Sequence, residues 1–154
     1  MMKKHDKNLE RVADILLVED NDGDVLLTKK AFKNALMLNE IRVAKDGEEA
    51  MSMLSPEEPY HLTPLPDIVL LDINLPKKDG IQVLEEMKQD AILRRIPVVI
   101  LTSSKAEKDI LKSYGLYANS YILKPPSLNQ FNDVVKAIEN FWFNVVILPN
   151  DYPH

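Results

Sequence analysis

The run DILLVED at residues 14–20 is mostly apolar and stops at two acids, Glu19 and Asp20. A continuous apolar run of this length is typical of a β-strand that is buried on both faces. Three later stretches repeat the pattern of an apolar strand that ends in a polar residue, and they lie at residues 68–72, 97–102 and 121–124. A shorter strand is expected at residues 40–44. These five strands are the framework of the predicted fold.

Helices are predicted after each of the five strands. The first is expected to run to about Leu36, and the last carries apolar side chains at spacings of mostly three and four as far as Trp142. The stretch 55–66 holds four prolines, which predicts a loop because proline lacks an N–H and fixes φ. The residues that mark helix starts are Asn21 and Asp22, Asp46 and Gly47, Gly80, Ser104 with Glu107, and Ser127 with Gln130.

This alternation of strands and helices predicts an α/β protein, with a doubly wound, five-stranded parallel sheet and helices on both faces. Doubly wound sheets have two common strand orders, and the one with five strands is 2-1-3-4-5, as in flavodoxin-like folds. We expect residues 1–10 to form a flexible N-terminal arm, residues 11–142 to form one domain, and residues 143–154 to form an apolar C-terminal tail.

The composition argues against several classes of protein. A net charge of -5 argues against a nucleic-acid or anionic-membrane surface, and the absence of cysteine excludes disulfides and thiolate metal sites. No apolar run approaches the roughly 20 residues that cross a bilayer, and the first ten residues contain no apolar signal core. We therefore expect a cytoplasmic protein with no membrane or nucleic-acid partner.

Polar residues stand at the ends of the predicted strands: Glu19 and Asp20, then Asp72, Thr102 and Lys124. Ligands of doubly wound sheets bind beyond the carboxyl ends of the strands, where the strand order reverses. The order 2-1-3-4-5 makes the first and third strands neighbours, so their three acids are expected to meet. Three carboxylates packed together repel one another, and a hard divalent cation such as Mg²⁺ relieves this repulsion.

The same residues predict phosphoryl chemistry. Asp20 and Asp72 can bind Mg²⁺ directly, while Glu19 can hold a metal-bound water. An oxygen of Asp72 can then attack phosphorus while Mg²⁺ and the Lys124 ammonium neutralise the phosphoryl oxygens. The product is an aspartyl phosphate.

At these motifs the chain resembles the response-regulator receiver family over about residues 14–142. The motifs lie at residues 17–21, 71–76, 79–80, 100–103 and 121–125. The resemblance implies a (βα)5 receiver whose phosphoacceptor is Asp72 and whose switch aromatic is Tyr121. It implies Thr102 and Lys124 as the phosphate-contacting residues, and Glu19, Asp20, Asp72 and the main-chain carbonyl of Asn74 as the Mg²⁺ site.

The resemblance also implies partners. The phosphoryl donor is expected to be a sensor histidine kinase or a phosphotransfer protein. The chain itself is expected to be no enzyme, apart from Mg²⁺-dependent self-phosphorylation and autodephosphorylation. A narrower resemblance, carried by residues 55–66, 75–80 and 140–142, is to single-domain regulators that partner bacterial phytochromes. About 12 residues follow the last predicted helix, so we expect a stand-alone regulator that signals by contact with a downstream protein.

The apolar tail leaves two options open. It either folds back on its own domain or extends a homodimer contact through the face formed by the helix predicted from Ser104, the strand at residues 121–124 and the last helix, which ends near Trp142. Three other functions fit the sequence less well than the receiver. A phosphatase with an aspartate nucleophile needs an acid two residues later, where this chain has Asn74. A flavin or nucleotide protein needs a phosphate-binding loop that is usually glycine-rich, but the four glycines are isolated. A pseudo-receiver lacks the acids that are present here. A signal carrier, a relay and a phosphate sink are not separated by the sequence.

Overall fold

The computed structural model describes residues 11–55, 64–102, 120–123 and 128–141. Its strands form one parallel sheet in the order β2-β1-β3-β4-β5. Their bounds are β1 Ala13–Val18, β2 Asn39–Ala44, β3 Ile68–Asp72, β4 Val98–Thr102 and β5 Ser120–Leu123. The expected parallel α/β architecture is confirmed. The complete (βα)5 pattern stays a prediction, because the helix expected between β4 and β5 lies outside the described residues.

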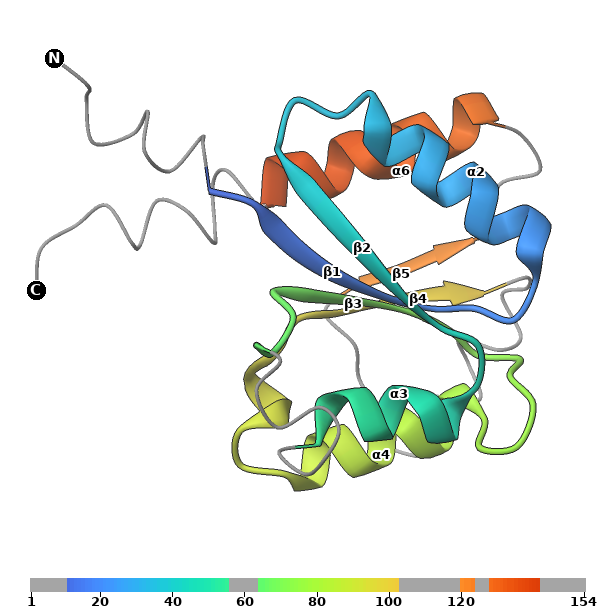
Figure 1. Cartoon of the computed structure of the whole chain (residues 1–154), viewed down its shortest axis with the longest axis vertical. Coiled ribbons are helices and arrows are strands. Elements are labelled where there is room, and N and C mark those ends of the chain that lie inside the picture. Colours follow the sequence, from blue (N-terminus) through green and yellow to red (C-terminus); the bar gives the residue numbers. More distant parts are fainter. Residues whose placement is uncertain (1–10, 56–63, 103–119, 124–127, 142–154) are drawn as a thin grey trace, which may run out of the picture.

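The described helices cover both faces of the sheet (Figure 1). Helices α2 (Asp22–Lys33) and α6 (Leu128–Phe141) lie on one face, and α3 (Gly47–Leu54) and α4 (Gly80–Gln89) lie on the other. A short 3-10 turn, η1 (Leu93–Arg95), leads into β4. None of the described helices combines the length and the apolar character needed to span a membrane.

The central strands β1 and β3 are apolar at almost every position because each faces two layers of helices. Leu16 and Val69 belong to the core under α3 and α4, whereas Leu17 and Leu70 belong to the core under α2 and α6. All four side chains are at most 1% exposed. Alternate residues of one strand therefore bury themselves on opposite faces, which is why the sequence shows continuous apolar runs.

One predicted boundary is wrong. Helix α2 ends at Lys33 rather than near Leu36, because Asn34 caps it with its main-chain N–H bonded to carbonyl oxygens of the last turn. Leu36 lies in the following loop and is 86% exposed. Of the two expected N-caps, Asn21 caps α2 and Asp22 is its first residue, and the helix start expected at Asp46 and Gly47 is confirmed. The side chains of Asn21 and Asp46 each accept a hydrogen bond from the first turn of their helix.

Candidate functional site

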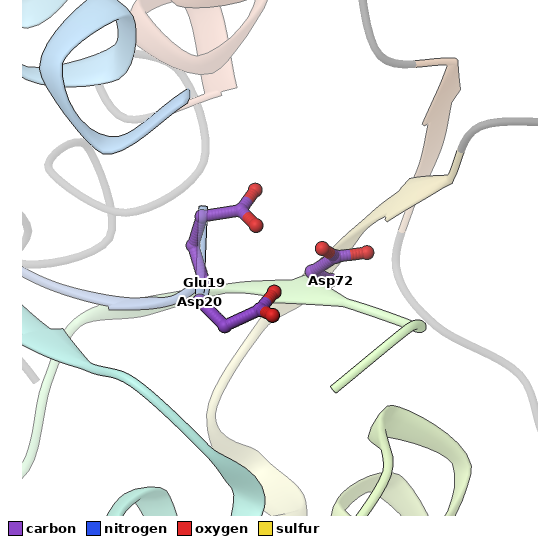
Figure 2. A group of neighbouring side chains, drawn as sticks. All are labelled: Glu19, Asp20 and Asp72. Carbon is purple, nitrogen blue, oxygen red and sulfur yellow. The ribbon is translucent and has the colours of Figure 1, made fainter. Parts of the chain in front are cut away.

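Three acids meet where β1 and β3 end. The register pairs Val18 with Leu71, so Glu19 and Asp72 come next on the two adjacent strands. One carboxylate oxygen from each of Glu19, Asp20 and Asp72 lies within 4.8 Å of the others. Figure 2 shows the three carboxylates around the space beyond the strand ends. The exposed fraction is 1% for Glu19 and 4% for Asp72, whereas Asp20 is exposed.

Main-chain N–H groups orient the two buried carboxylates. The N–H of Asn21 donates to Oε2 of Glu19 at 3.3 Å, and the N–H of Asn74 donates to Oδ1 of Asp72 at 3.1 Å. The bond is local in both cases, since donor and acceptor lie two residues apart. The turn after each strand therefore fixes the direction of the acid that precedes it.

A glycine lets the next helix start directly against Asp72. A Cβ atom on Gly80 would lie 2.4 Å from the carbonyl oxygen of Asp72 and 2.7 Å from Cα of Ile73, so no side chain fits there. The Gly80 N–H donates to the Ile73 carbonyl at 3.0 Å. Asp79 caps α4 in a reciprocal capping box with Gln82. These contacts close the turn between the acid and α4.

The exposed acid lies at the wall of an open pocket of about 430 Å³. The pocket is lined by Asp20, Asp79, Ile81 and residues 73–76 of the loop after β3. It therefore offers space for a ligand next to the acid cluster.

The donor set fits a hard divalent cation. It consists of carboxylate oxygens, two of them on buried residues, and such oxygens are what Mg²⁺ and Mn²⁺ prefer. Like charges held this close, on two buried residues and one exposed residue, are costly unless a cation stands between them.

The other predicted site residues are described only in part. Thr102 follows Leu101, which pairs with Asp72, so its backbone lies at the same rim of the sheet. Tyr121 lies in β5. The side chains of Thr102 and Tyr121, and the whole of Lys124, lie outside the described part, and their roles stay predictions. The sequence reading missed the close approach of Gly80 and the Asp79–Gln82 capping box, although the three-residue spacing of the box was a usable signal.

The model of the response regulator receiver domain matches residues 15–148. The chain belongs to the response-regulator receiver family. This receiver is 44% identical over 135 residues to response regulator Rcp1 of Synechocystis sp., covering 88% of this chain and 92% of Rcp1. It is thus a signalling protein of two-component systems, which sets the phosphatase and flavin alternatives aside.

Two solved structures resemble this receiver. The phosphorylated cyanobacterial phytochrome response regulator RcpA superimposes with a TM-score of 0.79 at 46% identity, covering 87% of this chain and 96% of RcpA. The Mn²⁺-bound form of Rcp1 superimposes with a TM-score of 0.77 at 43% identity, covering 89% of this chain and 99% of Rcp1. The narrower resemblance to regulators of the phytochrome type is therefore confirmed.

Proposed function

We propose that this response regulator accepts a phosphoryl group from a sensor histidine kinase on the carboxylate of Asp72. The observation that carries the proposal is the convergence of Glu19, Asp20 and Asp72 within 4.8 Å at the ends of two adjacent strands. The similarity to RcpA, a phytochrome response regulator in its phosphorylated form, supports the same role here and favours a phytochrome-type kinase as the donor.

The residues that would hold the metal are the carboxylates of Glu19, Asp20 and Asp72 and the main-chain carbonyl of Asn74. We propose Mg²⁺ as the ion, and the similarity to Rcp1, which has a Mn²⁺-bound form, supports a divalent cation as a ligand of this receiver. A bound Mg²⁺ supplies positive charge that neutralises phosphoryl oxygens.

Asp72 performs the covalent step. A carboxylate oxygen of Asp72 forms the new bond to phosphorus, and the bond between phosphorus and the donor histidine nitrogen breaks with its electron pair staying on that nitrogen. The Asn74 N–H keeps Asp72 turned toward the site. Lys124 and Thr102 complete the phosphate contacts, and Tyr121 reports the change to the face formed by the helix expected between β4 and β5, by β5 and by α6. The proposed framework is a (βα)5 receiver at residues 11–142.

The phosphoryl transfer is tested with acetyl phosphate and Mg²⁺, followed by intact mass spectrometry. We expect a gain of one phosphoryl group, which is lost in Asp72→Asn and in the presence of a chelator. Asp67→Asn is a matched control, since Asp67 precedes the same strand at its opposite end and is hydrogen-bonded to the Asp14 N–H. A phosphoryl gain that persists in Asp72→Asn would overturn the assignment of the acceptor.

We also propose that the receiver signals by protein contact, with a downstream target or through a homodimer that includes the tail at residues 143–154. A concentration series in analytical ultracentrifugation tests the homodimer. A monomer at high micromolar concentration, with and without phosphorylation, would rule out the dimer.

A further inference from the structure

We propose that residues 44–47, which carry none of the proposed metal ligands, form a brace that sets the distance between the two loops that do. The brace joins the end of β2 to the start of α3. It touches the loop of Glu19 and Asp20 at one end and the loop after Asp72 at the other. The inference rests on the divalent-cation site proposed above and assigns positioning residues to it.

The first end of the brace is fixed to β1 by the backbone. The Glu19 N–H donates to the Ala44 carbonyl at 2.9 Å, which ties the brace to a residue that carries one of the three carboxylates. An ion pair between Lys45 and Asp22 adds a second link, to the start of α2. Both side chains of this pair are largely exposed, and such pairs contribute little. The backbone bond is therefore the main attachment at this end.

The second end of the brace is packed against the loop that follows β3. A Cβ atom on Gly47 would lie 1.8 Å from the carbonyl oxygen of Lys78 and 2.6 Å from its carbon, so the two main chains are in direct contact. Asp46 caps α3 by accepting the Glu49 N–H at 2.8 Å, and its other oxygen lies 3.5 Å from Nζ of Lys77. Only a glycine at position 47 allows this approach.

The loop that the brace touches leads back to Asp72 in a few residues. Lys77 has a φ of 64°, a left-handed conformation that persists only when its surroundings hold it. Lys78 is also held by Glu86 of α4. At its base the loop is closed by the hydrogen bond from Gly80 to Ile73. Because these contacts hold the loop, a displacement of the Lys78 main chain is expected to displace Asn74 and Asp72 as well.

Gly47→Ala tests the brace, because the added methyl group must displace the Lys78 carbonyl. We expect the dissociation constant for Mn²⁺, measured by isothermal titration calorimetry, to rise about tenfold, as is usual when a group that orients metal ligands is lost. Gly23→Ala is the matched control, since Gly23 also lies in the first turn of a helix at this rim but its Cβ would meet only the side-chain oxygen of Asn21, at 3.1 Å. That control should bind Mn²⁺ like the wild type.

Asp46→Ala gives an independent test if Gly47→Ala does not fold. Its control is Asp90→Ala, because Asp90 likewise accepts main-chain N–H groups, from Ile92 and Leu93, but lies at the other end of α4. Both variants should melt at a lower temperature, and only Asp46→Ala should weaken Mn²⁺ binding, again by about tenfold. Asp46→Asn, which keeps an acceptor for the helix cap, should restore most of the affinity.

Two failures are distinguishable in these titrations. A wild-type protein that binds no Mn²⁺ and takes no phosphoryl group would overturn the proposed function, and the brace with it. A wild-type protein that binds Mn²⁺, together with folded Gly47→Ala and Asp46→Ala variants that bind it equally well, would overturn the brace alone.

Discussion

Gly80 shows how the geometry of Asp72 depends on a residue that has no side chain. The main chain of Gly80 packs on the Asp72 carbonyl, where a Cβ would lie at 2.4 Å. The contact is to backbone atoms of a buried strand, which cannot move aside as a flexible side chain would. Steric room, rather than a need for an unusual φ, requires glycine at this position.

The variant Gly80→Ala is therefore expected to lose about 1–3 kcal/mol of unfolding free energy, the usual cost of overpacking. Urea denaturation measures this loss. Phosphorylation of Asp72 by acetyl phosphate should also be slower in this variant, because the added methyl group displaces the main-chain carbonyl of Asp72. Gly23→Ala, whose nearest contact is a side chain, should stay within about 1 kcal/mol of the wild type. Equal stability of Gly80→Ala and wild type would contradict the packing contact.

Asp46 gives a prediction for pH. The hydrogen bond from the Glu49 N–H, helped by Lys77, holds the pKa of Asp46 below its ordinary value of 3.8. A lowered folded pKa means that Asp46 stabilises the fold above pH 3.8 and that this contribution is lost as the pH falls through the folded pKa. The stability difference between wild type and Asp46→Asn should therefore be larger at pH 7 than at pH 3 in urea denaturation. An equal difference at both values would contradict the ionic part of the cap.

The acids of the site were predictable residue by residue, whereas the glycine contacts were not. Glu19, Asp20 and Asp72 each end an apolar run, and the strand order then brings the runs together. The close approaches of Gly47 and Gly80 join residues whose proximity depends on the packing of α3 and α4. Neither contact leaves a pattern in the neighbouring sequence.

At the scale of whole elements, a buried acid of α6 holds the loop that follows α2. Oε2 of Glu139 accepts the N–H of Leu36 at 2.5 Å and that of Met37 at 3.2 Å, and Glu139 is only 8% exposed. These N–H groups belong to the loop that connects α2 to β2. The carboxylate therefore joins α6 to the loop that follows α2, its neighbour on the same face of the sheet (Figure 1).

Removing this acid should destabilise the protein by more than an ordinary surface change. Glu139→Ala leaves two N–H groups without their acceptor, and we expect a loss of about 2–3 kcal/mol, against about 1 kcal/mol for Glu139→Gln, which keeps an oxygen. Glu85→Ala, on the exposed side of α4, is the control and should cost less than about 0.5 kcal/mol. Chemical denaturation of the three variants compares these losses.

The same contact explains why the end of α2 was misplaced from the sequence. The sequence pattern predicted a helix as far as Leu36, but the helix ends at Lys33. The N–H of Leu36 instead donates to the carboxylate of Glu139, 103 residues further along the chain. The bounds of the strands were predicted more closely, because a buried parallel strand is a continuous apolar run in the sequence. The turn η1 was not predicted. The Asp90 carboxylate at the end of α4 accepts the main-chain N–H groups of Ile92 and Leu93, and such bonds leave no sequence signal.

At the scale of the whole molecule, the acid cluster should make stability depend on the divalent cation. A ligand that binds only the folded state at 100 times its Kd adds about 2.7 kcal/mol to the unfolding free energy. We therefore expect Mg²⁺ to raise the melting temperature of the wild type and to have a much smaller effect on Asp20→Asn.

Without the metal, removed by a chelator, Asp20→Asn should be the more stable of the two proteins. Without a cation, Asp20→Asn removes a charge that faces two other carboxylates, so this variant should be more stable than the wild type by roughly 0.5 kcal/mol. Asp133→Asn, an exposed change of the same charge on α6, should respond to Mg²⁺ like the wild type. An identical response of Asp20→Asn and wild type to Mg²⁺ would contradict the metal site.

The most direct measurement is a crystal structure of the chain grown with Mg²⁺ and beryllium fluoride, which mimics a phosphoryl group. We predict the beryllium adduct on a carboxylate oxygen of Asp72, with one Mg²⁺ ion among Glu19, Asp20 and Asp72 and beside the Asn74 carbonyl. An adduct on any other residue, or these three carboxylates turned apart with no ion between them, would contradict the proposed function.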